Sequence, residues 1–117
     1  MVEKGTFPEG IIAAGMVFQE FSLDEQRFRH TLEVMNDPAA GEKVENPVWF
    51  SAALLARRLT VVGLDRVTPE MVLDLSGPDG DELTRATLQL EQRRREFRNS
   101  AQAGTEAPDS SPEDGVQ

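Results

Sequence analysis

The sequence predicts an α+β domain that is mainly α, in which a short N-terminal β-hairpin packs on a small bundle of about four helices and a disordered C-terminal tail follows. Two short apolar runs near the N-terminus are separated by Gly-containing turns, which is typical of a hairpin. Further along, apolar residues recur at helical spacing between recognisable caps. Residues 99–117 contain no Leu, Ile, Phe or Met and carry four acids and no base, a composition that favours disorder. We therefore expect one domain over residues 1–98 and a disordered acidic tail over residues 99–117.

The hairpin is predicted over residues 6–23. Its segments, in order, are a Pro8-Glu9-Gly10 turn, the apolar pair Ile11-Ile12, an Ala13-Ala14-Gly15 turn and the run Met16-Val17-Phe18. Phe18 and Phe21 are three residues apart and would face opposite sides of a regular strand. We therefore expect a bulge near Glu20 that resets the register.

The segment 26–37 fits both a strand and a helix. The residues that alternate as in a strand are Phe28, His30, Leu32 and Val34, and those that share one helical face are Phe28, Leu32 and Met35. Leu, Glu and Met favour helix, and the Asn36-Asp37-Pro38 sequence suits a helix end. A helix over about residues 28–36 is therefore the favoured alternative.

Residues 46–62 hold the densest group of apolar residues. Asn46 can cap the first turn of a helix, and Pro47 suits its first position. The apolar positions at helical spacing are Val48, Ala52, Leu55, Leu59 and Val62, with Trp49, Ala53 and Ala56 beside them. The residues that look fit for water are Ser51, Arg57, Arg58 and Thr60. We predict a buried helix over about residues 47–62 that the rest of the chain covers.

Two more helices are predicted from their caps. Thr68 and Pro69 begin a short helix over about residues 69–75. Ser76 and Asp79 have capping-box spacing and begin a final helix over about residues 78–98. This helix places Leu83, Ala86, Leu90 and Phe97 on one face. Its acids lie in the first turns and its arginines in the last, so both clusters complement the helix dipole.

The overall composition excludes several classes of protein. Twenty-one acids against twelve bases give a formal net charge of −9, which argues against a nucleic-acid binder, because phosphate affinity comes mainly from Lys and Arg. The chain has no cysteine and one histidine, so disulfides, thiol catalysis and Cys-based zinc sites are excluded. No signal peptide precedes the domain and no apolar run could span a bilayer, so we expect a cytoplasmic protein without membrane contact.

No group of residues predicts catalysis. His30 could form an acid–base pair with Asp24 or Glu33, but no Ser or Cys stands in a nucleophile motif. The sequence Gly77-Pro78-Asp79-Gly80 lacks the glycine spacing and the lysine of a phosphate loop. We therefore expect a protein that is not an enzyme and that needs no metal and no cofactor.

Five residues are candidates for binding a partner: Trp49, Leu88, Arg93, Arg94 and Phe97. Trp49 is the only tryptophan and suits an interface anchor, with core packing as the alternative. Leu88 lies off the apolar face of the final helix and could be an exposed anchor. The arginines form the one basic patch in an acidic chain and suit an acidic partner or RNA, whereas stabilisation of a helix end is the alternative.

Several segments carry a family resemblance through their order and spacing. They are TFPEG, FQEFSL, FRHTLEVMND, AALLARRLTVVG and VTPEMVLDLSGPDGDELTRATLQLEQRRREF. Together they resemble the small tail assembly chaperones of tailed bacteriophages, of the kind found in Mu-like phages and prophages. The helical motifs of that family correspond to Leu54–Leu59, Val67–Leu73 and Leu75–Leu83. After the strand, where relatives commonly have an Arg- and Pro-containing stretch, this chain has Asp24-Glu25-Gln26.

The resemblance implies a protein that binds the long helical tape measure protein and keeps it soluble. It further implies help in polymerising the tail tube protein, action in the host bacterial cytoplasm and absence from the mature virion. Nucleic acid and membrane are not among the implied partners, and self-association is possible. A structural or tail-completion protein of the virion and a small phage regulatory protein are the alternative functions.

Overall fold

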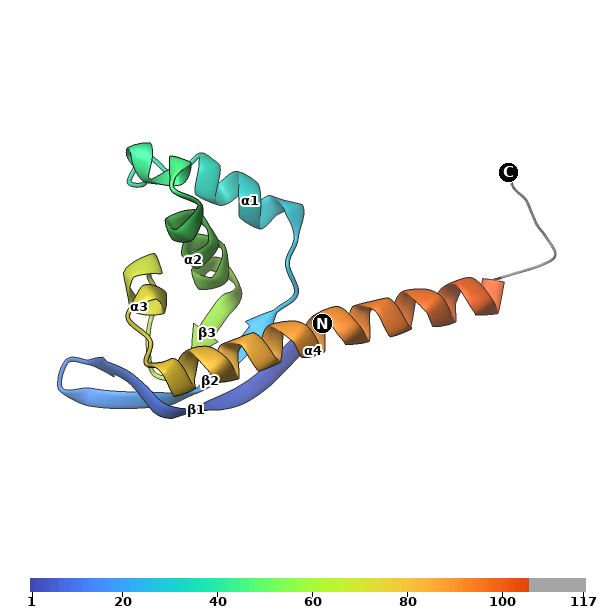
Figure 1. Cartoon of the computed structure of the whole chain (residues 1–117), viewed down its shortest axis with the longest axis horizontal. Coiled ribbons are helices and arrows are strands. Elements are labelled where there is room, and N and C mark those ends of the chain that lie inside the picture. Colours follow the sequence, from blue (N-terminus) through green and yellow to red (C-terminus); the bar gives the residue numbers. More distant parts are fainter. Residues whose placement is uncertain (106–117) are drawn as a thin grey trace.

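A long β-hairpin forms the base of the fold. The structure is a computed structural model that describes residues 1–105, with side chains to residue 101. Strands β1 (Val2–Ala13) and β2 (Met16–Asp24) pair antiparallel, and β3 (Leu59–Val61) pairs antiparallel with the other edge of β2 (Figure 1). Ala14 and Gly15 turn the hairpin with φ angles of 52° and 75°, the positive values that a two-residue hairpin turn requires. The predicted hairpin is confirmed, and its first strand begins earlier than expected.

The pairing of the hairpin is irregular in the middle of β1. Residues 7–10 of β1 have a single residue of β2 opposite them, so the predicted Pro8-Glu9-Gly10 turn is a bulge inside the strand. The extra residues therefore lie in β1, and the bulge expected near Glu20 of β2 was placed on the wrong strand. The irregular register lets buried Phe21 and partly buried Phe18 pack against the same core.

The core lies between one face of the sheet, α2 (Pro47–Arg58), α3 (Pro69–Leu73) and the first half of α4 (Gly77–Thr105) (Figure 1). Asn46 caps α2 as predicted, since its Oδ1 accepts from the backbone N–H of Val48 at 2.9 Å. Thr68 caps α3 through its hydroxyl, which accepts from Met71 N–H at 3.2 Å. The buried apolar cluster is formed by Phe7, Ile11, Phe21, Leu23, Ala56, Leu59, Val61, Val67, Leu83, Ala86 and Leu90.

The central helix is shorter than predicted. It ends at Arg58, and Leu59–Val61 forms β3 in place of a last helical turn. The β-branched residues after Arg58 favour a strand, and the free edge of β2 offers it a partner. Arg58 was expected to be exposed but is buried, because its Nε donates to the Asp24 carbonyl at 2.9 Å. Burial also lowers the pKa of Arg58.

Helix α1 (Phe28–Met35) confirms the helical alternative for this segment. His30 and Val34 form its buried face, on the side of α2, and the short helix η1 (Gly41–Glu45) follows. The Nδ1 atom of His30 accepts from the backbone N–H of Arg27 at 3.0 Å and so fixes the first turn of α1. The apolar face that helical spacing predicts, with Phe28, Leu32 and Met35, is therefore the exposed face of α1.

Helix α4 extends beyond its predicted end. It runs to Thr105, so the helix does not end at about residue 98, and residues 99–105, which were predicted to be disordered, are helical. The remainder of the expected disordered tail lies outside the described residues. Leu83, Ala86 and Leu90 are buried as expected, but Phe97 is 67% exposed because the second half of α4 projects past the sheet (Figure 1). The molecule is therefore elongated, measuring 60 × 32 × 23 Å.

Candidate partner-binding surface

Asp79 in the first turn of α4 binds the edge strand β1 through hydrogen bonds. This buried carboxylate accepts from the backbone N–H groups of Glu9 and Gly10 at 2.8 and 2.9 Å, which lie in the bulge of β1. The hydroxyl of Ser76 accepts from the Asp79 N–H at 3.3 Å, so part of the predicted capping box is present. The Asp79 side chain itself accepts hydrogen bonds from N–H groups of the edge strand β1 that would otherwise lack a partner.

Two arginines of α4 continue this attachment toward the N-terminal end of β1. Arg85 lies 3.0 Å from the Glu3 carboxylate and also pairs with Glu82 at 2.9 Å. Hydrogen bonding by Arg85 lowers the pKa of Glu82. Arg93 lies 2.9 Å from Glu3 and donates to the Val2 carbonyl at 2.6 Å. Arg93, a predicted partner-binding residue, is therefore engaged within the chain.

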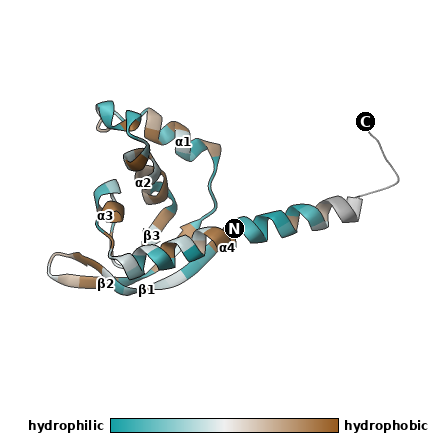
Figure 2. Cartoon of the chain, viewed as in Figure 1, coloured by the Kyte–Doolittle hydropathy of each residue, from teal (hydrophilic) through white to brown (hydrophobic). Residues whose placement is uncertain are grey.

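Helix α1 presents an uncovered row of large apolar side chains. Phe28, Leu32 and Met35 lie on one face and are 74%, 42% and 58% exposed, respectively. We call these three residues the α1 stripe. Figure 2 shows hydrophobic residues along α1, which lies at the outside of the fold. Contiguous apolar surface of this kind marks an interaction site more often than single exposed residues do.

A hollow surface joins the start of α1 to the second half of α4. A pocket of about 320 Å³ lies between them and is lined by Arg27, Phe28 and Arg94, among others. A second hollow of about 270 Å³ continues along α4 and shares Glu91 and Arg94 with the first. We call this surface the α1/α4 notch; its residues are Arg27, Phe28, Glu91, Arg94, Arg95 and Arg98.

The positive charge of the notch is only partly compensated. Glu25 lies beneath it, 3.5 Å from Arg27 and 4.0 Å from Arg94. A hydrogen bond from the N-terminal amine, at 3.0 Å, is the main cause that lowers the pKa of Glu25, and these arginines add to it. Arg95 and Arg98 form no ion pair with any residue in the described part of the chain.

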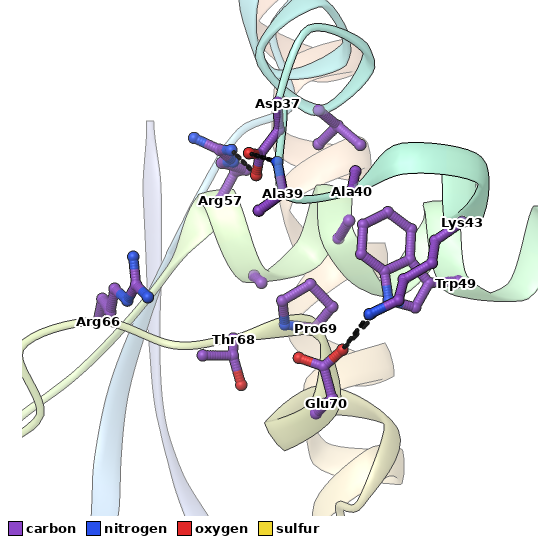
Figure 3. A pocket seen from close by; sticks show the side chains of 13 residues that line it. Asp37, Ala39, Ala40, Lys43, Trp49, Arg57, Arg66, Thr68, Pro69 and Glu70 are labelled. Carbon is purple, nitrogen blue, oxygen red and sulfur yellow. Dashed lines mark hydrogen bonds and ion pairs between the residues drawn. The ribbon is translucent and has the colours of Figure 1, made fainter.

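Trp49 lies in a separate pocket of about 300 Å³ between η1, α2 and α3 (Figure 3). Its indole N–H donates to the Glu70 carboxylate at 3.3 Å, and the Lys43 ammonium lies 5.9 Å from its ring centroid. A backbone hydrogen bond and this indole lower the pKa of Glu70. Trp49 is thus half-buried and held by neighbours. At the rim, Arg66 forms no ion pair with any described residue (Figure 3).

The hairpin turn carries a second exposed apolar group. Ile12, Met16 and Val17 are exposed, and Ile12 is the cross-strand partner of Val17. Figure 2 shows hydrophobic residues near this end of the hairpin, away from α1. The sequence indicated strands here but gave no sign that their apolar ends would remain uncovered.

The five predicted partner-binding residues do not form one site. Arg94 lines the notch and Phe97 lies between Arg95 and Arg98 on α4 without lining either hollow, whereas Arg93 faces β1 and Trp49 lies in its own pocket. Leu88 is 60% exposed, as expected, and lies one turn before Glu91 on the notch side of α4. The prediction missed the α1 stripe and Arg27. Helical spacing grouped the three stripe residues on one face but carried no information on whether that face would be exposed.

His30, which was considered for acid–base chemistry, is buried and engaged within α1. Burial is the main cause that lowers the pKa of His30, and its Nδ1 is already occupied by the Arg27 N–H. Within residues 1–105, no three His, Asp or Glu side chains are grouped so that they could hold a metal ion. In the same part of the chain, no helix has both the length and the apolar character needed to cross a bilayer.

Comparison with known proteins identifies no relative. No family model matches the chain, and neither a curated protein nor a solved structure matches it. The exposed surfaces of the fold and the motifs of the sequence are therefore the features that bear on function.

Proposed function

We propose that this protein is a phage tail assembly chaperone that binds the tape measure protein and keeps it soluble while the tail tube assembles. It acts in the host bacterial cytoplasm without catalysis and is left out of the mature virion. The observation that carries the proposal is the α1 stripe, three large apolar side chains uncovered along one helix beside the free half of α4. Such a surface suits the apolar side of a client helix.

The family resemblance supplies the identity of the client. Its three helical motifs coincide with structural units, because Leu54–Leu59 spans the end of α2, Val67–Leu73 contains α3 with its cap, and Leu75–Leu83 contains the start of α4. Asp79 and Leu83 of the third motif are buried against the sheet. These motifs support a shared fold, and the exposed α1 stripe supports the binding role.

The charge of the chain also suits a chaperone. A net charge of −9 makes copies of the protein repel one another, which keeps them soluble while they hold an apolar client. The α1 stripe offers three large side chains for contact, and central anchors of this kind contribute about 1–3 kcal/mol each. The resulting affinity allows release when the tail tube protein, a second candidate partner, replaces the chaperone.

A structural or tail-completion protein is the second candidate function. The exposed hairpin end, with Ile12, Met16 and Val17, favours it, because a projecting β-hairpin can insert between neighbouring subunits of an assembly. The two functions differ in their final location. A structural protein stays in the particle, whereas a chaperone leaves it.

Co-expression with the tape measure protein of the same phage tests the proposal. We expect the soluble fraction of the tape measure protein to rise, the two proteins to co-purify, and purified tails to lack this chain by mass spectrometry. The control is co-expression of the tape measure protein with an unrelated acidic protein of similar size. An unchanged soluble fraction contradicts the chaperone function, and a fixed copy number in purified tails favours the structural alternative.

A further inference from the structure

The α1 stripe and the arginines of α4 form one continuous surface. Phe28 belongs to both, since it begins the stripe and lines the pocket that it shares with Arg94. Arg94 in turn lines the second hollow with Arg95 and Arg98. In Figure 1, the first turn of α1 is the end nearer to the projecting half of α4. An apolar row therefore leads directly into a basic row.

The charge of this surface is opposite to that of the rest of the chain. The notch residues include four arginines and one glutamate, and the lining of the two hollows further includes buried Arg58 and Glu25, although the whole chain has twenty-one acids and twelve bases. One of the two glutamates, Glu25, already faces the N-terminal amine and Arg27. Arg95 and Arg98 have no acidic partner among residues 1–101. Their uncompensated charge attracts an acidic group and repels a basic one.

The spacing of the apolar residues fits a helix. Phe28, Leu32 and Met35 follow the i, i+4, i+7 pattern, so the stripe is about 10 Å long and matches about two turns of a second helix. Nucleic acid fits this surface less well, because the apolar side chains lie where phosphates would need cations and Glu91 stands among the arginines. A second copy of this acidic chain would carry its own arginines to the same place.

We propose that the α1 stripe and the α1/α4 notch together recognise an amphipathic helix of the partner whose apolar side is flanked by acidic residues. The stripe takes the apolar side of that helix, and Arg94, Arg95 and Arg98 take its carboxylates. This inference rests on the proposed function only in taking the partner to be a helical protein. It adds the place of binding and the charge that the bound segment must have.

Two designed helical peptides test this recognition on the full-length protein. Both carry the same leucines at i, i+4, i+7 spacing, and the flanking positions hold Glu in one peptide and Lys in the other. By fluorescence anisotropy of labelled peptides, we expect the acidic peptide to bind about tenfold or more tightly than the basic one, with affinity falling as salt rises. Equal affinities for both peptides would overturn the proposal.

Two pairs of matched variants locate the binding. Phe28→Ser should weaken binding of the acidic peptide about tenfold. Val48→Ser, at a similarly exposed apolar position in the first turn of α2, should leave binding unchanged. Arg95→Glu should weaken binding about fivefold, whereas Arg66→Glu, the same charge change at another arginine without an ion pair in the described part of the chain, should not. All four side chains are exposed, so circular dichroism melting should be the same as for the unaltered chain.

Other occupants of the surface give different results. Displacement of the acidic peptide by an oligonucleotide at lower concentration than by unlabelled peptide would assign the surface to nucleic acid and overturn the proposal. A dimer in sedimentation that Phe28→Ser converts to monomer would assign it to a second copy and overturn it as well. Acidic-peptide binding without tape measure binding would reject the proposed function and keep this inference. If the unaltered chain binds the tape measure protein and Phe28→Ser and Arg95→Glu leave that binding unchanged, this inference is rejected and the proposed function is kept.

Discussion

Similar apolar side chains are buried in the sheet core of this molecule and exposed on its α1 side. We define the sheet core as β1–β3, α3 and α4 through Leu90, and the α1 side as α1 with α4 beyond Leu90. In the sheet core, Leu83 is 3% exposed, and two N–H groups in the bulge of β1 are bonded to the Asp79 carboxylate of α4. On the α1 side, Phe28 and Phe97 are 74% and 67% exposed.

This difference separates stability from recognition within one small domain. A single helix, α4, takes part in both regions, and the apolar face that Leu83, Ala86 and Leu90 bury is exposed at Phe97. Beyond Leu90, the contact of α4 with the sheet that remains is the polar one of Arg93 with Glu3 and Val2. Residues of the sheet core should therefore determine the free energy of unfolding. Residues of the α1 side should affect binding and leave that free energy nearly unchanged.

The largest effect on stability is expected from Leu83→Ala. The side chain is buried among sheet and helix residues, so its truncation leaves a cavity and should lower the free energy of unfolding by about 2–5 kcal/mol. Phe97→Ala in the same helix is the matched control and should change it by less than about 0.5 kcal/mol. Urea denaturation of both variants measures the difference. Similar losses for the two variants would show that the free half of α4 is covered in solution.

The next effect is expected from Asp79→Ala. The substitution removes two charge-assisted hydrogen bonds to the N–H groups of Glu9 and Gly10 and should cost about 2–3 kcal/mol. Hydrogen exchange at these two amides should accelerate more than at the other amides of β1. Asp81→Ala, an exposed acid in the same helical turn, controls for the helix dipole. Equal losses for the two variants would mean that the dipole accounts for the role of Asp79.

The element types of this fold could be predicted from local sequence signals. Caps at Asn46 and Thr68 and the turn at Ala14-Gly15 act within a few residues, so they are visible in the sequence and present in the structure. The end of α2 could not be predicted in the same way. Leu59 continues a helical pattern, but the unpaired edge of β2 recruits it into a strand, and that edge lies far away in sequence.

The candidate site could be predicted less well, because exposure depends on long-range packing. Helical spacing correctly grouped Phe28, Leu32 and Met35, but nothing local shows that α1 would use His30 and Val34 to contact the rest of the fold. Phe97 continues the apolar face of α4 in sequence, yet the sheet ends before it. Apolar periodicity therefore identified the right faces without deciding which of them would be covered.

A smaller effect is expected from the protonation of His30, which tests how α1 is attached. Its pKa lies below the ordinary 6.5, mainly through burial and then through Arg29, so the folded protein favours the neutral ring. The stability that this neutral ring contributes is fully present above pH 6.5 and is lost as the pH falls through the lowered pKa. The charged groups around His30 are Arg29, Glu33, Arg58 and Asp24.

His30→Asn isolates this titration. The Asn Oδ1 can replace Nδ1 as acceptor for the Arg27 N–H, and the amide does not titrate. Thermal unfolding between pH 7.5 and about pH 5 should therefore show a steeper loss of stability for the unaltered chain than for the variant. Parallel curves would mean that α1 is held by Val34 and its other contacts without help from the neutral imidazole.

The smallest effect on stability, and the most informative on binding, is expected from Leu88. This residue belongs to the half of α4 that lies on the sheet, yet it is 60% exposed and shares the notch side of the helix with Glu91 and Arg95. Leu88→Glu and Leu88→Lys should both leave the free energy of unfolding within about 0.5 kcal/mol of the unaltered chain. In the peptide assay, Leu88→Glu should weaken binding of the acidic peptide more than Leu88→Lys does, because the new glutamate adds a negative charge beside the arginines. Equal weakening by both would make Leu88 an apolar contact without a charge effect, and no weakening by either would end the binding surface at Glu91 and restrict it to the α1 side.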